Sequence, residues 1–325
     1  MLMPPFNLHH PETVEEACEL ASTFLANDES FDWVAGGTDL LPNYKWHINV
    51  KKHVISLANI KGIDTISMHE IGAMARLGAL ADSEDVHPLI ASAASKVASF
   101  LIRNNATLGG NICLDTRCFW FNQSEDWRRS IDWCHKEDCG TGSDCRVIPN
   151  QNTLCVATYQ GDIAPSLMVL EGLIHIIGPS GQRQVPVNEF FKLDGITRNV
   201  LESGEFVLKV TFPEGVEHRV GSYKKLRVRE SWDFPEAGVA SSWIVGQPSS
   251  LRIASTALES VPRFHQSEID AIEEVFSSDL VASLSKAIMK SIKPVNNTAL
   301  PPRYRKSMVR VLTKRSLHEI LGDEA

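Results

Sequence analysis

The chain has 325 residues, of which 43% are hydrophobic and 22% are charged, and its formal net charge is −8. This length and composition are typical of a globular protein with about two domains. The net negative charge disfavours nucleic acid or an anionic membrane as the main partner. The sequence has neither a run of about 18 apolar residues nor a signal-peptide pattern at its start, so we expect a cytoplasmic protein.

The first third of the chain predicts a helix, several short strands and a second helix. Residues 8–26 form the first helix, because Thr13 and Glu16 have the spacing of a capping box and an apolar face follows. Cys18 lies on that face, and we expect a buried core thiol. Residues 31–35 and 52–80 predict strands, and residues 81–102 predict a helix.

Two Gly-Gly turns, AGGTD at residues 35–39 and TLGGN at residues 107–111, occur about seventy residues apart. Consecutive glycines allow backbone N–H groups to converge on an anion, since no side chain is in the way. One such turn is weak evidence, but two of them could hold a diphosphate from both sides. Thr38 or Asp39 is also a candidate cap for the helical turn that follows. Neither a Rossmann fingerprint nor a P-loop pattern is present.

A cysteine-rich segment follows the second turn. Six of the seven cysteines lie between Cys113 and Cys155, in a polar stretch of about forty residues without apolar periodicity. Thiolates gathered around a metal centre would order such a loop, and in a reducing compartment clustered cysteines bind metal more often than they form disulfides. The spacing matches neither a ferredoxin run nor a paired zinc site. Spacing alone slightly favours structural zinc over an iron–sulfur cluster.

The second half of the chain predicts an α+β arrangement. Residues 159–165 read as the beginning of a helix that runs to residue 170, residues 172–212 as strands with a hairpin at residues 179–181, and residues 214–218 as a domain boundary. Strands follow from residue 221, and residues 267–292 and 301–321 predict helices. The basic run PPRYRKSMVRVLTKR is more typical of a solvated helix face or a subunit contact than of a nucleic-acid site.

Four motifs together resemble a known family: AGGTDL, ATLGGNI, GDIAPSLMVL and YKKLRVRESWDFP. The resemblance covers essentially the full length and is to the FAD-binding subunits of the molybdenum hydroxylases, which include xanthine dehydrogenase and the medium subunit of carbon monoxide dehydrogenase. It implies a PCMH-type FAD-binding domain of two subdomains in residues 1–215. It also implies a smaller α+β C-terminal domain, an antiparallel sheet with helices, in residues 216–325.

The cysteine-rich segment is an insertion of about residues 114–158 relative to most members of that family. With its LDTRC, FNQSE, CRVI and CVATYQGD motifs it is similar to the insertion of the 4-hydroxybenzoyl-CoA reductase β subunits, which carries an additional [4Fe–4S] cluster. The resemblance implies four cluster ligands: Cys118, Cys134, Cys145 and Cys155. It leaves Cys139 spare, although a swap with Cys134 is possible, and Cys113 in the core. We expect the tryptophans of the insertion to shield the cluster: Trp120, Trp127 and Trp133.

The resemblance also implies the contacts of FAD. The backbone of both glycine turns would hold the pyrophosphate, Asp39 would shape its turn, and Asp162 would hydrogen-bond a polar part of the flavin nucleotide. Ile102 and Val207 would pack on the flavin ring. Lys225 would lie near the ring, where a cation stabilises a reduced flavin anion; its alternative is a solvated strand lysine. The implied cofactor residues are Ala35, Gly36, Gly37, Thr38, Asp39, Ile102, Thr107, Gly109, Gly110, Asn111, Asp162, Val207 and Lys225.

These features imply an electron-transfer subunit that carries FAD and a [4Fe–4S] cluster. It would pass electrons from reduced ferredoxin toward a molybdenum site on a partner subunit, for the reductive dehydroxylation of 4-hydroxybenzoyl-CoA to benzoyl-CoA in anaerobic aromatic degradation. The implied partners are a molybdopterin-containing large subunit and a [2Fe–2S] small subunit, in a dimer of heterotrimers. We expect no catalytic acid, base or nucleophile in this chain.

Three alternatives remain open at this point. The chain could be the FAD subunit of another molybdenum hydroxylase, of the xanthine or carbon monoxide dehydrogenase type, with a different substrate. It could be a flavin oxidase acting alone, although nothing in it resembles a substrate domain. It could also be a flavin-independent or zinc-stapled assembly scaffold.

Overall fold

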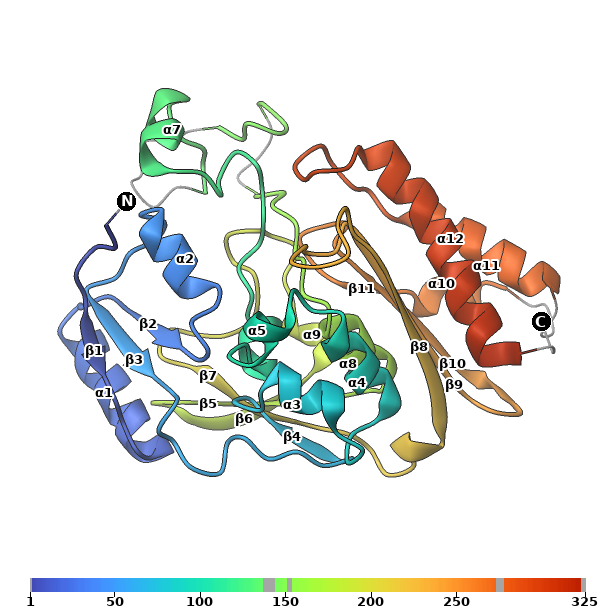
Figure 1. Cartoon of the computed structure of the whole chain (residues 1–325), viewed down its shortest axis with the longest axis horizontal. Coiled ribbons are helices and arrows are strands. Elements are labelled where there is room, and N and C mark those ends of the chain that lie inside the picture. The colour runs from blue at the N-terminus through green and yellow to red at the C-terminus, as the bar shows by residue number, and fades with distance from the viewer. Residues whose placement is uncertain (1, 137–143, 151–153, 273–277, 323–325) are drawn as a thin grey trace.

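The computed structural model describes residues 2–136, 144–150, 154–272 and 278–322. Its strands form one small parallel sheet at the N-terminal end and two antiparallel sheets of four strands each. Figure 1 shows the three sheets following one another along the long axis of the molecule. The parallel sheet has the spatial order β1 (Asn7–His9), β3 (His53–Ser56) and β2 (Phe31–Val34). The middle sheet has the order β4 (Glu70–Gly72), β7 (Phe206–Thr211), β5 (Leu173–Gly178) and β6 (Gly181–Pro186). The C-terminal sheet has the order β11 (Arg263–Phe264), β10 (Gln247–Thr256), β9 (Ala237–Ile244) and β8 (Arg219–Leu226).

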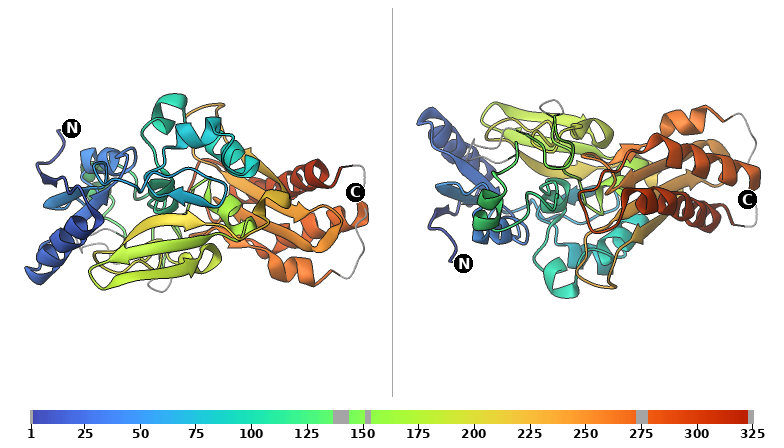
Figure 2. Two further views of the ribbon diagram at one scale, coloured as in Figure 1. Left: turned by 90° about the horizontal axis from the view of Figure 1, so that it is seen from below. Right: turned by 90° about the horizontal axis from the view of Figure 1, so that it is seen from above.

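Helices cover the sheets and connect them. The C-terminal sheet lies between α12 on one side and α4 and α8 on the other (Figure 1), and Figure 2 shows α1 and the pair α11 and α12 at opposite ends of the molecule. The helices of the described residues are α1 (Val14–Ala26), α2 (Leu40–Lys45), α3 (Leu77–Asp82), α4 (Pro88–Ser95), α5 (Phe100–Arg103), α6 (Leu108–Ile112), α7 (Glu125–Ser130), α8 (Ala164–Val169), α9 (Val187–Phe190), η1 (Val216–His218), α10 (Gln266–Asp270), α11 (Ser278–Ser291) and α12 (Pro302–Leu321).

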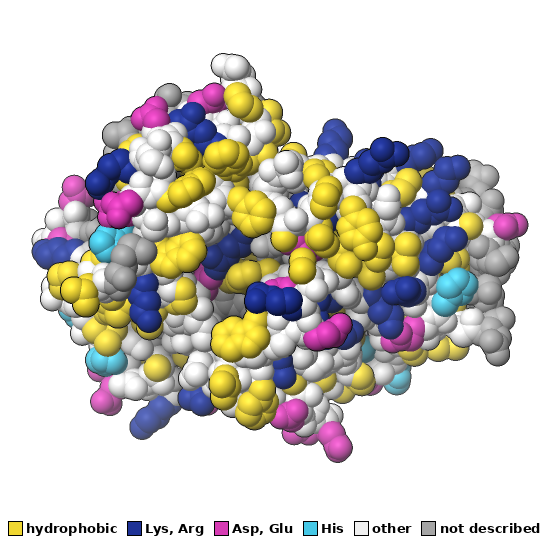
Figure 3. All heavy atoms as spheres, turned by 45° about the horizontal axis from the view of Figure 1, so that its top comes forward, with side chains coloured by type: hydrophobic (Ala, Val, Ile, Leu, Met, Phe, Trp, Pro, Cys, Tyr) yellow, Lys and Arg dark blue, Asp and Glu magenta, His cyan; other side chains and the backbone are white. Residues whose placement is uncertain are grey.

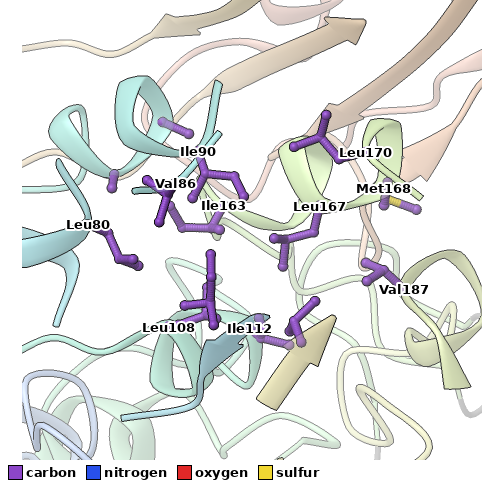
Figure 4. Close-up of a cluster of buried hydrophobic side chains, with 14 of the residues drawn as sticks. Leu80, Val86, Ile90, Leu108, Ile112, Ile163, Leu167, Met168, Leu170 and Val187 are labelled. Atoms are coloured by element: carbon purple, nitrogen blue, oxygen red, sulfur yellow. The ribbon is translucent and has the colours of Figure 1, made fainter. Parts of the chain in front are cut away.

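The largest hydrophobic core lies between the middle sheet and the C-terminal sheet. Figure 4 shows its centre, where Leu108 and Ile112 of α6 lie near Ile163 and Leu167. Because the core also includes Tyr223 and other residues of the C-terminal sheet, the segments before and after residue 215 share one core. The second glycine turn, which enters α6, is therefore fixed by the main core.

The N-terminal helix confirms its sequence signal, with one correction. The hydroxyl of Thr13 accepts a hydrogen bond from the Glu16 N–H at 3.1 Å, and the Glu16 carboxylate accepts one from the Glu12 N–H at 2.7 Å. The helix begins at Val14, whereas residues 7–9 form β1, so the prediction of a helix from residue 8 is wrong at its start. Cys18 is partly buried and packs against a core cluster, as expected.

The prediction of one long helix over residues 81–102 is wrong. Pro88 cannot continue a preceding helix, so it begins α4 instead, and the His87 ring nitrogen caps that start by accepting from the Leu89 N–H at 3.1 Å. Ala98 has a φ of +40°, which turns the chain before α5. The preceding helix, α3, covers residues for which we predicted a strand.

The C-terminal half follows its predicted elements more closely. The hairpin of β5 and β6 and the final helix α12 are confirmed. The helix predicted for residues 267–292 is described as α10 and α11, with residues 273–277 outside the described part. Within the described residues, no helix combines the length and the apolar character needed to cross a bilayer.

Candidate functional site

The two glycine turns pack directly against each other. A Cβ atom on Gly36 would lie 1.8 Å from the carbonyl oxygen of Asn105, which no real side chain can do. A Cβ on Gly110 would lie 3.9 Å from the Cβ of Ala35, which is ordinary contact. Gly36 is therefore required by the close approach of the turns, and Gly37 by its φ of +68°.

The turns line one cavity of about 570 Å³, which is within the range of about 300–1,000 Å³ common for cofactor sites. All the predicted cofactor residues except Lys225 lie in its wall. Ile102 and Val207 supply apolar surface, and Asp162 supplies a carboxylate, so the wall combines the kinds of group that a flavin nucleotide needs. The twelve lining residues are Ala35, Gly36, Gly37, Thr38, Asp39, Ile102, Thr107, Gly109, Gly110, Asn111, Asp162 and Val207.

The two turns differ in what their backbones offer. In the second turn the Gly109 N–H donates to the Ala73 carbonyl at 2.8 Å, and the Gly110 N–H donates to the Thr107 hydroxyl at 3.2 Å. The N–H groups of residues 36–38, in the first turn, make no hydrogen bond to any described residue. The first turn therefore has N–H donors available to an anion. The N–H groups of Gly109 and Gly110 in the second turn are already used, so these glycines chiefly shape the cavity wall.

Asp39 occupies the N-cap position of α2, but its side chain makes no capping hydrogen bond there. The prediction that Thr38 or Asp39 caps this helical turn through its side chain is therefore wrong. The Asp39 carboxylate forms an ion pair with Arg117, which comes from the cysteine-rich insertion. The Arg117 guanidinium also lies 4.8 Å from the centre of the Phe234 ring. Burial, with a contribution from Arg198, lowers the pKa of Arg117 to about 10. Sequence reasoning missed both arginines, although they line the cavity.

Lys225 is buried, so the alternative of a solvated lysine is wrong. Its ammonium donates to Asp162 Oδ2 at 3.0 Å and to the Lys96 carbonyl at 2.9 Å. The Tyr223 hydroxyl donates to the other oxygen of Asp162 at 2.7 Å. Burial raises the pKa of Asp162 and lowers the pKa of Lys225, while their mutual attraction opposes both shifts. Lys225 therefore does not line the cavity itself but contacts Asp162, which does.

Four cysteines of the insertion line a second, smaller cavity: Cys118, Cys134, Cys145 and Cys155. All four are buried. Burial, with smaller contributions from the neighbouring cysteines, raises the pKa of the Cys118 thiol to about 12 and that of the Cys155 thiol to about 11. Of the three tryptophans expected to shield this site, only Trp120 lines the cavity; Trp127 is 36% exposed. Cys139 lies outside the described residues.

The potential metal ligands of the smaller cavity are thiols, and thiolates are soft ligands that suit zinc or an iron–sulfur cluster. Four thiolates around one zinc would bring their sulfurs within roughly 3.8 Å of one another, given Zn–S bonds of about 2.3 Å. Within the described residues, no group of three or more His, Cys, Asp or Glu side chains has an arrangement that could hold a metal ion. A cluster spreads its thiolates over several irons. The cavity measures about 10 Å³, room for about one water.

Part of the insertion is ordered by protein contacts. It contains α7, and Arg128 of that helix is 1% exposed. The guanidinium of Arg128 donates to the carbonyls of Trp46 and His47, both at 3.0 Å, and lies 5.4 Å from the centre of the Trp133 ring. This part of the insertion therefore has regular structure, although its sequence has no apolar periodicity. In Figure 1 the segment rises above α2.

The two cavities share a short stretch of chain. Asp115 lines the larger cavity and Cys118 lines the smaller one. Lys136, in the wall of the smaller cavity, donates to Asp115 Oδ1 at 2.8 Å and to the Thr116 hydroxyl at 2.7 Å. Arg198 of the larger cavity lies 3.0 Å from the same Asp115 oxygen. A buried network of charges therefore connects the walls of the two sites.

The chain matches known proteins over its full length. Residues 4–215, more than half of the chain, match the family described as the FAD binding domain in molybdopterin dehydrogenase. The aldehyde oxidoreductase FAD-binding subunit of Escherichia coli is 29% identical over 68% of this chain and 73% of its own length. The carbon monoxide dehydrogenase medium chain of Hydrogenophaga pseudoflava is 25% identical over 98% of both chains.

Solved structures share the fold. Carbon monoxide dehydrogenase from Hydrogenophaga pseudoflava superimposes with a TM-score of 0.77 at 23% identity, over 98% of both chains. Quinoline 2-oxidoreductase from Pseudomonas putida 86 gives a TM-score of 0.75 at 18% identity, again over 98% of both chains. These likenesses agree with the mixed α and β architecture and its antiparallel sheets. The chain therefore belongs to the family of FAD-binding subunits of the molybdenum hydroxylases.

Proposed function

We propose that this chain is the FAD- and [4Fe–4S]-carrying electron-transfer subunit of a 4-hydroxybenzoyl-CoA reductase. It would pass electrons from reduced ferredoxin toward the molybdenum site of a partner subunit, for reductive dehydroxylation to benzoyl-CoA. Its partners would be a molybdopterin-containing large subunit and a [2Fe–2S] small subunit, in a dimer of heterotrimers. A bound cluster supplies one-electron transfer, and FAD exchanges electrons between donors and acceptors.

The observation that carries the proposal is the convergence of four buried cysteines in the insertion. Cys118, Cys134, Cys145 and Cys155 line one cavity, although they are spread over a long segment of sequence. Soft thiolate ligands suit an iron–sulfur cluster. Cys118 is joined to the wall of the flavin cavity through Asp115, so the two sites lie on one continuous piece of chain.

A second candidate is the FAD subunit of a molybdenum hydroxylase with another substrate. The relatives favour it, since they include the FAD-binding subunits of a xanthine dehydrogenase and of an aldehyde oxidoreductase and the medium chain of a carbon monoxide dehydrogenase. Substrate chemistry occurs on partner subunits in this proposal, so the flavin cavity is common to both candidates and the cysteine cavity is the feature that favours the reductase.

The first test is an anaerobic analysis of iron, acid-labile sulfide, zinc and FAD in the purified full-length chain. The proposal predicts about four irons and four sulfides per FAD. Cys134→Ser and Cys155→Ser should lose the iron and sulfide and retain FAD. Cys18→Ser is the matched control, because Cys18 lies on α1 in another core cluster and should change neither content.

Other outcomes separate the candidates. FAD with one zinc and no sulfide, or FAD with no metal, would remove the reductase proposal and leave an ordinary flavin subunit. If iron and sulfide are found, the complex with its partner subunits is assayed with reduced ferredoxin and 4-hydroxybenzoyl-CoA. Benzoyl-CoA formation supports the reductase, and its absence under conditions where another substrate is oxidised supports the second candidate.

A further inference from the structure

The flavin cavity contains an unusual balance of charge for a site that binds an anionic cofactor. Six carboxylates lie in its wall, and each of them has an ion-pair or hydrogen-bond partner: Asp32, Asp39, Asp115, Asp162, Glu205 and Asp233. Among the described lining residues the only Lys or Arg side chains are those of Arg117 and Arg198. A dianionic pyrophosphate would therefore meet positive charge at these two positions.

We propose that Arg117, a residue of the cysteine-rich insertion, binds the pyrophosphate of FAD beside the first glycine turn, with Arg198 as a second cation. The family comparison concerns FAD binding as such and assigns no role to either arginine. The proposal rests on FAD binding alone and holds whether or not the insertion carries a cluster.

The position of Arg117 carries the first part of this inference. Its ion pair with Asp39 places the guanidinium at the end of the first glycine turn. Asp39 directly follows residues 36–38, whose backbone N–H groups make no hydrogen bond to any described residue. An anion held by those N–H groups would lie next to the guanidinium. Free backbone donors and a neighbouring arginine are a recurrent combination for phosphate.

The hydrogen bonds of Arg117 carry the second part. Its Nη1 donates to Asn43 Oδ1 at 3.4 Å and its Nη2 pairs with Asp39, but its Nε is buried without any hydrogen-bond partner. A buried guanidinium N–H without a partner is costly, and here it belongs to a side chain in the cavity wall. The planar fork of arginine matches phosphate oxygens, so a phosphate would supply the missing acceptor.

The relation between the two arginines carries the third part. Arg117 and Arg198 both line the flavin cavity. Arg198 is held by Asp115, and Arg117 by Asp39, so two cations from different loops face one cavity. A dianion bound in this cavity would be attracted to both guanidinium groups. The wall therefore offers two cations to a doubly charged group.

Arg117 also links the flavin cavity to the cysteine-rich insertion. Arg117 is the residue before Cys118, and its backbone N–H and carbonyl pair with those of Thr158, both at 2.7 Å, just beyond Cys155. A phosphate that holds Arg117 would also hold the segment that carries two of the buried cysteines. FAD binding is thus expected to protect this part of the insertion, which hydrogen exchange of residues 114–118 and 155–159 can follow.

The test compares ligands with and without phosphate on the deflavinated full-length chain. Arg117→Gln should weaken FAD binding by about 10- to 100-fold, the range expected for a lost hydrogen bond to a charged group. It should leave the affinity for riboflavin, which lacks phosphate, within about twofold, and make FAD binding less dependent on salt. Arg252→Gln is the matched control, because Arg252 pairs with Glu171 outside the cavity and carries the same charge.

Asp39→Asn separates phosphate binding from a merely structural role of the ion pair. If Arg117 binds phosphate, this variant frees the guanidinium and removes a nearby negative charge, so FAD should bind a few-fold more tightly. If Arg117 only holds the turn in place, Asp39→Asn should weaken FAD as much as Arg117→Gln does. That result, or an equal loss of FAD and riboflavin in Arg117→Gln, would overturn the proposal.

Arg117→Lys is the second variant at this position, and it replaces Arg117→Gln if the glutamine variant does not fold. Lysine retains the charge but loses the planar fork, so FAD binding should fall by less than in the glutamine variant and riboflavin binding should not change. Unchanged FAD affinity in Arg117→Lys together with weaker binding in Asp39→Asn would also overturn the proposal. Iron and sulfide contents are independent of these outcomes, so failure here is distinct from failure of the reductase assignment.

Discussion

The ammonium of Lys136 lies 2.8 Å from a carboxylate oxygen of Asp115, and this buried pair joins the walls of the two cavities. Lys136 belongs to the cysteine cavity, and Asp115 belongs to the flavin cavity. Lys136 also lies over the Phe121 ring at 4.5 Å, within the cluster of side chains that surrounds the cysteines. The pair therefore holds the insertion against the FAD-binding domain through a contact between two largely buried charges.

Removing the lysine should be strongly destabilising. Lys136→Met leaves the Asp115 carboxylate buried with Arg198 as its remaining charged partner, and breaking a buried pair typically costs about 3–5 kcal/mol. Urea unfolding of the full-length chain measures the loss. Arg129→Gln is the control, because its pair with Glu125 is exposed and should contribute less than about 1 kcal/mol. Equal effects of the two substitutions would contradict the importance of the buried pair.

Asp115 should also make stability depend on pH. Burial alone raises the pKa of Asp115, but the charges of Lys136 and Arg198 outweigh burial and hold the pKa below its usual range. A depressed folded-state pKa contributes stability above the unfolded value of about 3.9, and that contribution is lost as pH falls through the folded value. The free energies of unfolding of the wild type and Asp115→Asn should therefore converge between about pH 5 and pH 2. A difference that stays constant over this range would argue against the shift.

Gly36 should not tolerate even a methyl group. A Cβ there would meet the Asn105 carbonyl oxygen at 1.8 Å, so Gly36→Ala must push the two turns apart, and overpacking of this kind costs about 1–3 kcal/mol. FAD affinity should fall with stability, because the same turns line the cavity. Gly246→Ala is the control: its φ of +76° costs about 1 kcal/mol, but nothing lies within 4 Å of the new Cβ. FAD titration should show weaker binding for Gly36→Ala than for Gly246→Ala. Normal FAD binding by Gly36→Ala would be inconsistent with this geometry.

Arg305 should be essential for the C-terminal helix pair, although it lies in a basic run that the sequence suggests is solvated. Its side chain is 0% exposed and donates to the carbonyls of Glu236 at 2.9 Å and Val295 at 3.1 Å. Arg305→Gln should destabilise the chain by about 3–5 kcal/mol. Arg310→Gln on the same helix is exposed and should change stability by less than about 0.5 kcal/mol. Thermal unfolding distinguishes the two, and similar melting temperatures would contradict the buried role.

Three other basic side chains of α12 are exposed, as predicted for a solvated helix face: Arg303, Arg310 and Arg315. In Figure 3 Lys and Arg side chains gather over the C-terminal helices, at the opposite end of that face from the N-terminal domain. Arg305 departs from them because Glu236 and several backbone carbonyls converge on its position. Sequence periodicity marks the face of a helix but not the acceptors that another element brings to it.

Local patterns in the sequence determined the features that depend on near neighbours along the chain. The Thr13 cap, the β5 and β6 hairpin, the final helix and the two glycine turns need only a few adjacent residues to form. The cysteine-rich insertion and the likeness to the family were also visible in the sequence. Twelve residues of the flavin cavity were implied by the resemblance to the family, whereas Arg117 and Arg198 of the same wall were not predicted.

Tertiary structure alone decided how distant charges meet. The pairs of Arg117 with Asp39, Lys136 with Asp115 and Lys225 with Asp162 join segments far apart in sequence, and nothing in the local pattern of either partner specifies the other. The break of the predicted helix at Ala98 has the same origin, because an alanine at positive φ is disfavoured locally and is held there by its surroundings. Burial turns surface-like residues into buried ion pairs, and burial is a property of the packed fold.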